Sequence, residues 1–405
     1  MIRKAKILLK ISRSYGIRAA LDFSLNWLLA KTLAKSNRNY LTAQVFDPFA
    51  SKPENTFFSE YSPTSPLVWY VPSWTNVWGG GHFTIFRFAH LISIHRENFV
   101  YVYNNEGRCS AEHFENSIKN AFPKSQLKVL IDPTLIPKDA IPMATTWQSA
   151  YSVLQHSYHS GIKFYFMQDY ENLFYAHGTE SMQALQSYKL GFVPITGGPW
   201  LLSKYHENSK STHTGMNYMF AIDHSVFFPA LVPRNDISRI FFYGRPSTER
   251  RCFELGISAL KLIKDKYPKI EIVIAGLDGI KSVGFEATMI GSAELPKLGE
   301  LYRSCDLGIA LSATNLSYLP LELMACGVPV ISNDGPQVEW FCENNVNSLV
   351  VPPYPSSIVN AVESLIADRA LYEQLRDGGL EKVRQLSWES EANKISDFIN
   401  RTIYS

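Results

Sequence analysis

Two arginines that follow a glycine turn offer the clearest phosphate-binding chemistry in the sequence. Arg245 comes directly after Gly244, and Arg250 follows five residues later, at the expected start of a helix. A guanidinium group grips a diphosphate through two parallel charge-assisted hydrogen bonds and stays charged at any relevant pH. The pair therefore predicts an anion site; the alternative is that both are solvated surface arginines. We expect the neighbouring Arg251 to be solvated.

A second anion-binding geometry is predicted within residues 306–333, DLGIALSATNLSYLPLELMACGVPVISN. An apolar strand, a loop, a short helix and another strand follow one another there. Pro320 suits the first helical turn, and Gly327 supplies the left-handed stop. The turn formed by Leu319, Pro320 and Leu321 would direct free backbone amides and the positive end of the helix dipole at the loop.

Glu322 follows in the first turn of this helix, where its carboxylate can accept hydrogen bonds from hydroxyl groups. Amides for a diphosphate and a carboxylate for a ribose diol together suit a sugar nucleotide. The alternative is a glutamate that only interacts with the helix dipole, a contribution of about 0.3–1 kcal/mol.

The segment PLELMACGVPVISN resembles the nucleotide-binding signature of the family-4 retaining glycosyltransferases of GT-B fold. Glu322 takes the place of the second glutamate of that signature. Thr314 stands where the first would fall, so the chain departs from the pattern there. SYLPLE is similar to the rhamnosyltransferase branch, which builds rhamnan and surface-layer polysaccharides. The resemblance covers roughly residue 67 to the end, and its motifs are most specific in the C-terminal half.

What the resemblance implies is a nucleotide-sugar donor and a glycan or lipid-linked oligosaccharide acceptor. The branch points to dTDP-L-rhamnose, with UDP- and GDP-sugars as alternatives, and the family transfers with retention of configuration. By the same resemblance, Arg245 and Arg250 are the basic pair, and the loop from Ser292 to Leu295 packs the nucleobase. No cofactor is implied. The chain has no Asp-x-Asp motif, so we expect no metal.

In the N-terminal half, three glycines follow the first expected strand. Gly79, Gly80 and Gly81 precede a helix expected from His82 to His95. Glycines at such a turn let the backbone approach a ligand closely. In the resembled family a glycine-rich loop at this place faces the cleft between the domains, so we expect these glycines and His82 to line the acceptor side. A plain tight turn is the alternative.

Two carboxylates, Asp169 and Glu171, follow the strand expected at Lys163–Met167. Ligands of open α/β sheets bind outside the carboxyl ends of the strands. Both residues are therefore candidates for a general base or a sugar-hydroxyl ligand facing the acceptor. One alternative is that they are acidic residues at a helix start. Another is the metal motif of the GT-A transferases, which follows one Rossmann-like half, whereas this chain shows two.

The alternation of strands and helices predicts an α/β chain of GT-B architecture, two Rossmann-like domains facing a cleft. We expect an acceptor domain over residues 42–228, a donor domain over residues 229–387, and a helix over residues 388–405 that crosses back onto the first domain. The expected strands are 67–71, 98–103, 129–131, 140–144, 163–167, 192–196, 240–243, 270–276, 287–290, 306–312, 330–332 and 349–351.

The first 41 residues differ in charge from the rest of the chain. They hold nine basic residues against Asp22 alone, whereas the 405 residues together have a net charge of only +2, which gives no nucleic-acid signal. Apolar and aromatic residues recur there at helical spacing, and the run from Ala19 to Ala30 is too short to cross a bilayer. We expect an amphipathic helix on an anionic membrane, so that the protein is peripheral on the cytoplasmic face of the plasma membrane. The alternative is a helix packed on its own domain.

Other functions remain as alternatives. The substitution at Thr314 allows a non-catalytic subunit that binds a nucleotide sugar or a glycan, and a nucleotide-sugar epimerase has the same fold. A dinucleotide dehydrogenase is poorly supported, since no strand leads into a complete Gly-x-Gly-x-x-Gly that opens a helix. The five scattered cysteines have no metal-ligand spacing, and we expect them to be reduced.

Overall fold

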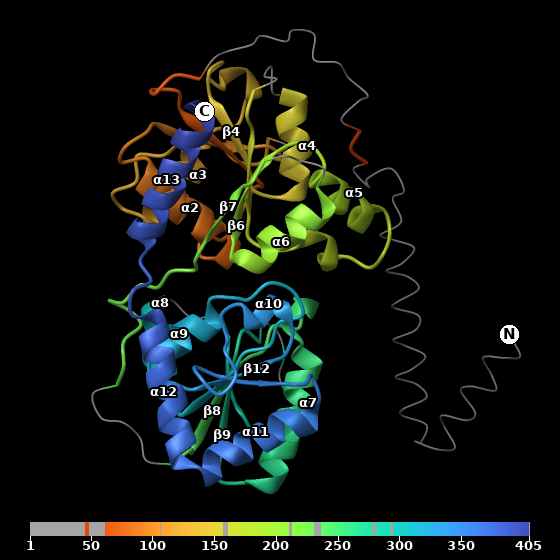
Figure 1. Cartoon of the computed structure of the whole chain (residues 1–405), viewed down its shortest axis with the longest axis vertical. Coiled ribbons are helices and arrows are strands. Elements are labelled where there is room, and N and C mark those ends of the chain that lie inside the picture. Colours follow the sequence, from red (N-terminus) through yellow and green to blue (C-terminus); the bar gives the residue numbers. More distant parts are fainter. Residues whose placement is uncertain are drawn as a thin grey trace, which may run out of the picture. The chain divides into compact units, whose positions relative to one another are not determined.

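A computed structural model describes residues 45–47, 61–105, 107–156, 161–209, 213–230, 236–277, 280, 282–291 and 295–404 (Figure 1). The basic segment expected to lie on a membrane, residues 1–41, falls outside these ranges. The chain divides into two compact units, residues 1–46 and residues 47–405, and the second contains both sheets.

The first sheet has seven parallel strands in the order β3-β2-β1-β4-β5-β6-β7. Every residue of β1, β2, β4, β5 and β6 is buried, which is typical of a parallel sheet covered by helices on both faces. Its strands are β1 (Leu67–Val71), β2 (Asn98–Val102), β3 (Lys128–Leu130), β4 (Ile141–Ala144), β5 (Phe164–Met167), β6 (Val193–Gly197) and β7 (Met216–Tyr218). The connecting helices are α2 (Gly80–Ile92), α3 (Ala111–Ala121), α4 (Trp147–His156), α5 (Thr179–Ser187) and α6 (Pro199–Asn208), with short 3₁₀ turns η1 (Pro133–Leu135) and η2 (Glu171–Phe174).

The second sheet has six parallel strands in the order β10-β9-β8-β11-β12-β13. Figure 1 shows α7 and α11 on one side of it and α8, α9 and α12 on the other. Its strands are β8 (Arg239–Tyr243), β9 (Glu271–Ala275), β10 (Thr288–Ile290), β11 (Leu307–Ile309), β12 (Val330–Asn333) and β13 (Leu349–Val351). Its helices are α7 (Phe253–Lys266), α8 (Leu295–Arg303), α9 (Leu319–Ala325), α10 (Pro336–Glu339), α11 (Pro355–Ala367) and α12 (Arg369–Val383), with the 3₁₀ turn η3 (Glu249–Arg251).

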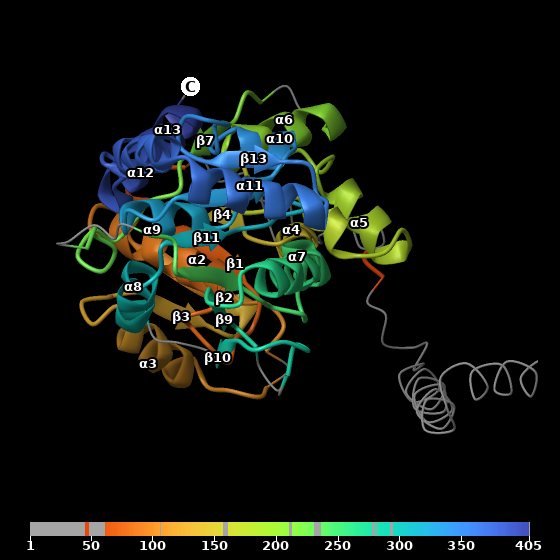
Figure 2. The ribbon, with the colours of Figure 1, turned by 90° about the horizontal axis from the view of Figure 1, so that it is seen from below.

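Strand order reverses at one point in each sheet, between β1 and β4 and between β8 and β11. Ligands of such sheets bind outside the carboxyl ends of the strands at this switch point. The segments that follow β1, β4, β5, β8 and β11 therefore matter most for function. Figure 2 looks along the molecule from below and shows strands of the two sheets superposed, with helices on either side.

The final helix, α13 (Trp388–Tyr404), packs against α2 and β7 of the first sheet. Trp388 is buried against Phe88, with ring centroids 5.2 Å apart. The carboxylate of Glu391 accepts a hydrogen bond of 3.0 Å from the amide of Met219. An apolar ring contact and a buried polar contact thus tie the end of the described chain to the N-terminal sheet.

Several boundaries differ from the sequence-based expectation. Helix α2 begins at Gly80 rather than His82, and β11 covers only Leu307–Ile309 of the strand expected over 306–312. The expected strand was too long because Ser312 bonds instead to the side chain of Asn333. Helices α3 and α5 were not predicted.

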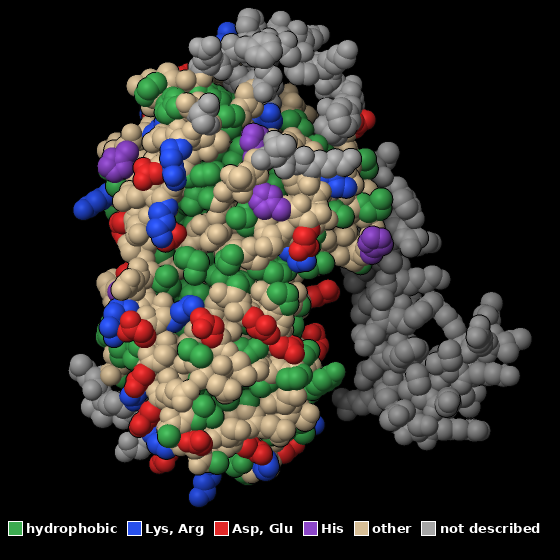
Figure 3. Space-filling view, viewed as in Figure 1, with side chains coloured by type: hydrophobic (Ala, Val, Ile, Leu, Met, Phe, Trp, Pro, Cys, Tyr) green, Lys and Arg blue, Asp and Glu red, His purple; other side chains and the backbone are tan. Residues whose placement is uncertain are grey.

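On the face shown in Figure 3, acidic and basic side chains are interspersed over the second sheet's half of the molecule. This mixed surface agrees with the small net charge of +2. Among the described residues, no helix has both the length and the apolar composition needed to cross a bilayer.

Candidate functional site

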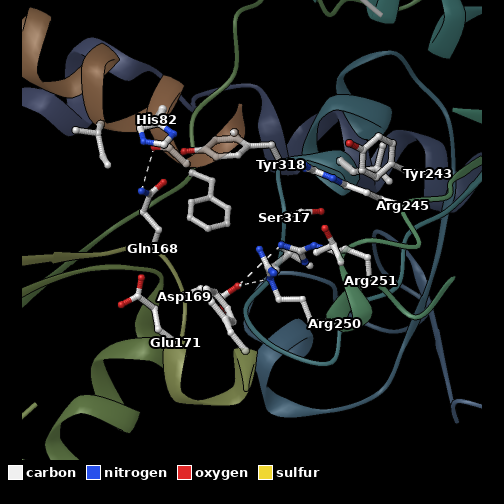
Figure 4. A pocket seen from close by; sticks show the side chains of 18 of the residues that line it. His82, Gln168, Asp169, Glu171, Tyr243, Arg245, Arg250, Arg251, Ser317 and Tyr318 are labelled. Carbon is white, nitrogen blue, oxygen red and sulfur yellow. Dashed lines mark hydrogen bonds and ion pairs between the residues drawn. The ribbon is translucent and has the colours of Figure 1, made fainter. Parts of the chain in front are cut away.

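A cavity of about 370 Å³ lies where the carboxyl ends of the two sheets face each other (Figure 4). Both halves of the chain line it. The predicted site residues that contribute are Gly80, Gly81, His82, Asp169, Glu171, Arg245, Arg250, Leu319 and Glu322. The other predicted residues, Gly79, Gly244, Leu295, Thr314, Pro320 and Leu321, do not line this cavity.

The glycine segment forms a helix start rather than a loop. Gly79 is the N-cap of α2, and Gly80 and Gly81 are its first two residues. A methyl group at Gly80 would meet nothing within 4 Å, so this turn leaves open space in front of the helix. His82 lies next to it, 3.3 Å from the carbonyl oxygen of Pro72, and burial lowers the pKa of its imidazole. Burial therefore favours the uncharged form of this ring.

Asp169, a candidate general base or sugar-hydroxyl ligand, is buried, and both of its carboxylate oxygens have polar neighbours. One carboxylate oxygen accepts from the amides of Tyr170 and Asn315, at 2.8 and 2.9 Å. The other accepts from the hydroxyl of Thr314 at 2.9 Å and lies 3.3 Å from Nε of Arg250. Thr314 is itself only 2% exposed. Thr314, which stands at the position of the first glutamate of the family signature, thus contacts a carboxylate of the first half of the chain.

Three arginines follow β8, and their environments differ. Arg245 is exposed at the cavity. The guanidinium of Arg250 lies 4.1 Å from the ring centre of Phe174 as well as beside Asp169. Arg251 was expected to be solvated, and this is wrong. It donates to the hydroxyl of Ser312 at 2.6 Å and to the carbonyl of Asn315 at 3.1 Å.

Glu171 lies behind Asp169 with little exposure (Figure 4). The same oxygen, Oε2, accepts from the amide of Trp147 and, at 3.0 Å, from the hydroxyl of Tyr165. Burial nevertheless dominates and raises the pKa of this carboxyl to about 8. At pH 7 Glu171 is mostly protonated, so it can donate a hydrogen bond but is a poor base.

Glu322 lies in the first turn of α9, as expected. Burial raises its pKa to about 7, partly opposed by a hydrogen bond from Tyr302. Leu319 lines the cavity, whereas Pro320 and Leu321 are buried behind it. Because α9 has only seven residues, we give its dipole little weight at this site.

A second, mostly apolar cavity of about 570 Å³ adjoins the first. The two share Gly80, Leu298, Tyr318 and Glu322. Leu295, the described residue of the loop expected to pack the nucleobase, lines this second cavity; residues 292–294 are outside the described ranges. Glu322 therefore lies at the junction between a polar cavity that holds arginines and an apolar one.

Sequence reasoning missed several lining residues. Gln168 donates to the carbonyl of Gly81 at 3.1 Å and so links β5 to the start of α2. The hydroxyl of Tyr318 accepts from Thr84 at 3.2 Å, across the two halves of the chain. Gln168 directly follows a buried strand and Tyr318 directly precedes a helix. Those positions are signals that could have identified both residues.

Comparison with known proteins bears on the fold and on the setting of this site. Residues 238–363 match the family described as the C-terminal domain of WsaF. The O-antigen biosynthesis protein RfbC of Myxococcus xanthus is 36% identical over 344 residues, which cover 81% of this chain. Those residues amount to 26% of RfbC, so the chain spans about a quarter of that relative.

Two solved structures show the same fold over most of the chain. Sucrose-phosphate synthase of Thermosynechococcus elongatus matches with a TM-score of 0.63 and 14% identity, covering 84% of this chain and 99% of that one. HepE of Anabaena, solved in complex with UDP-glucose, matches with a TM-score of 0.64 and 12% identity, covering 83% and 99%. The expected pair of Rossmann-like parallel sheets is confirmed, and this chain has the GT-B fold.

Proposed function

We propose that this protein transfers a sugar from a nucleotide diphosphate donor to a growing polysaccharide or lipid-linked glycan. The observation that carries the proposal is the composition of one cavity. Arg245 and Arg250 enter it from β8, Glu322 enters it from α9, and the first sheet closes it from the opposite side. The likeness to RfbC, an O-antigen biosynthesis protein, favours polysaccharide synthesis as the setting.

The order of groups in the two cavities suits an extended donor. The base would occupy the apolar cavity lined by Leu295, and the ribose hydroxyls would bond to Glu322 at the junction. The diphosphate would then reach the arginines, with the sugar beside Gly80, Gly81 and His82. This assigns donor binding to residues 229–387 and acceptor binding to residues 42–228.

Charge accumulates on the β-phosphate as the sugar departs. Arg245 and Arg250 would stabilise that charge, and fixed donors of this kind contribute about 3–4 kcal/mol each in enzyme sites. Burial lowers the pKa of His82 and so disfavours a competing positive charge beside the sugar. We carry over retention of the anomeric configuration from the family resemblance.

For the donor we propose dTDP-L-rhamnose. The resemblance of the segment SYLPLE to the rhamnosyltransferase branch supports this donor. At position 314 a buried threonine replaces a glutamate, so no charge is offered from that position to a sugar hydroxyl. UDP-sugars are the alternative, since HepE has been solved with UDP-glucose. We further propose that the protein acts at the cytoplasmic face of the plasma membrane, held through residues 1–41.

A thermal-shift screen of dTDP, UDP, GDP and their sugars tests donor binding directly. Binding to the folded state alone stabilises it by about 2.7 kcal/mol at a ligand concentration 100 times Kd. We expect dTDP-L-rhamnose to give the largest shift. Transfer to a rhamnose-terminated lipid-linked acceptor, followed by mass spectrometry of the product, then tests the activity. A shift with UDP-glucose alone would refute the rhamnose assignment.

Two observations favour a second candidate function, a non-catalytic subunit that binds a nucleotide sugar. Arg250 is paired with Asp169, and Thr314 replaces a carboxylate. Tight nucleotide binding without transfer to any acceptor would support that alternative.

A further inference from the structure

The loop that follows β11 crosses from the second sheet to the first. Its residues Thr314 and Asn315 bond to the carboxylate of Asp169 through a hydroxyl and a backbone amide, both at 2.9 Å. Asp169 lies just after β5, 145 residues earlier in the chain than Thr314. One buried carboxylate therefore joins the two halves of the candidate site.

The side chain of Asn315 strengthens the same crossing. Its amide nitrogen donates to the carbonyls of Gln168, at 3.0 Å, and Gly197, at 2.7 Å, at the ends of β5 and β6. Its oxygen accepts from the indole nitrogen of Trp340 at 3.2 Å. Asn315 is completely buried, so each of these bonds forms away from water, where an unmade bond is costly.

The same carboxylate also faces a proposed phosphate-binding arginine. Oδ2 of Asp169, which accepts from Thr314, lies 3.3 Å from Nε of Arg250. Among the described residues, that buried nitrogen has no hydrogen-bond acceptor, and the carboxylate of Asp169 is the charge beside it. The ring of Phe174 lies under the guanidinium at 4.1 Å. Arg250 is thus held between a carboxylate and a ring that both belong to the first half of the chain.

We propose that Asp169 is a positioning residue: held by Thr314 and Asn315, its carboxylate orients Arg250 and keeps the two halves of the site closed around the donor. This rests on the proposed function and gives Asp169 a role other than the base that takes the acceptor's proton. A base needs a lone pair free to face the acceptor. Instead, Oδ1 of Asp169 has two polar neighbours and Oδ2 has three, because a guanidinium nitrogen of Arg251 also lies 4.0 Å from Oδ2.

The positioning role makes nucleotide binding depend on both halves of the chain. Arg250 follows β8, but its orientation comes from residues that follow β5. The guanidinium of Arg250 is therefore oriented for a diphosphate only when Thr314 and its loop contact Asp169. Loss of the docking contact should weaken phosphate binding even when every arginine is kept.

Two variants separate positioning from base catalysis. Asp169→Asn keeps the shape of the side chain and removes its charge. Thr314→Val keeps shape and burial and removes only the hydroxyl that donates to Asp169, from the opposite half of the chain. Glu97→Gln is the matched control, because it neutralises an exposed carboxylate of the first half that pairs with Lys128 at 2.8 Å. Each protein is assayed for donor kinetics across pH 5–9, for dTDP and UDP affinity by calorimetry, and for radius of gyration by X-ray scattering.

If Asp169 is a positioning residue, both variants weaken nucleotide affinity and increase the radius of gyration of the unliganded protein. Glu97→Gln changes neither quantity. We expect Asp169→Asn to lower kcat/KM by about 10- to 100-fold, as a misplaced binding group does, with a smaller loss in Thr314→Val. The double variant should lose less than the two single losses combined, since both break one contact. The acidic limb of the pH profile should persist in Asp169→Asn.

The opposite pattern would overturn the proposal. If Asp169 is a base, Asp169→Asn abolishes the acidic limb of the pH profile while nucleotide affinity and size stay unchanged, and Thr314→Val behaves like wild type. Affinity and scattering need no transfer reaction, so they decide the positioning role even if no acceptor is found and the proposed transfer fails. Should Asp169→Asn not fold, the same two measurements on Thr314→Val decide alone.

Discussion

Glu171→Gln should make the protein more stable at neutral and alkaline pH. Burial raises the pKa of the Glu171 carboxyl from its ordinary 4.5 to about 8. The folded state therefore prefers the protonated form, and the unfolded state ionises first as pH rises. The contribution of this group to stability is complete below pH 4.5 and is lost progressively as pH rises to about 8. Glutamine resembles the protonated acid and has no such loss.

The magnitude follows from the same two pKa values. Each pH unit between them corresponds to about 1.4 kcal/mol, so the full interval amounts to at most about 5 kcal/mol. Trp147 and Tyr165 both donate to Oε2, so a glutamine with its carbonyl oxygen at that position keeps both bonds. The substitution should therefore change charge and little else.

The assay is denaturant unfolding of wild type and Glu171→Gln at pH 5, 6, 7 and 8. The difference in free energy of unfolding should grow in favour of the variant by about 1.4 kcal/mol per unit across this range. The pKa of Glu322 is also raised, to about 7, so its ionisation lowers stability as pH rises. This loss is the same in wild type and variant and therefore cancels from the difference in free energy of unfolding. Glu97→Gln, at an exposed site, should show no such growth. A difference that stays constant with pH would mean that Glu171 is ionised in the folded protein, and the burial argument would be wrong.

Four further predictions concern binding and catalysis. Glu322→Ala should raise the donor KM and spare kcat, because ribose does not change during transfer; loss of hydrogen bonds to a charged group costs about 1.5–3 kcal/mol. Arg250→Ala should lower kcat by about 100- to 1000-fold, and Arg250→Lys should recover part of it in the same assay. Transfer measured in EDTA should equal transfer in magnesium, since Arg245 and Arg250 supply the charge; a strict metal requirement would contradict this. The full chain should sediment with anionic vesicles at low salt and be released at high salt, whereas a chain without residues 1–38 should not sediment.

The strands of the fold were largely predictable because buried parallel strands appear as short apolar runs. The first expected strand, Leu67–Val71, coincides with β1, and the expected final helix coincides with α13. The start of α2 was misplaced because glycine has a low helix propensity, yet Gly80 and Gly81 are the first two residues of the helix. Helix α5 has a weak amphipathic pattern. Helix α3 does carry a signal that was overlooked, because Ser110 caps it and Phe114 and Ile118 are buried one turn apart.

The site was predictable where it depends on topology. Carboxyl ends of parallel strands meet at one edge, so residues that follow β5 and β8 line one cavity. The sequence could not predict which side chains form hydrogen bonds and ion pairs with residues that are distant in the chain. Arg251 looked like a surface residue because its acceptors, Ser312 and Asn315, come 61 and 64 residues later. The assignments of individual residues to base, ribose and phosphate stay predictions.

The return of α13 to the first sheet affects how the chain can fold as it is synthesised. Trp388 packs in the core with Phe88, and Asn400 accepts a hydrogen bond from Arg96, a residue made 304 positions earlier. The first sheet leaves the ribosome before α13 is made, so the surface that α13 covers is exposed. This surface stays exposed until the whole second sheet and then α13 have been synthesised. Exposed apolar surface of this kind promotes aggregation during the wait. Expression of the first sheet alone should therefore give an aggregation-prone product, and adding α13 as a separate peptide should improve its solubility.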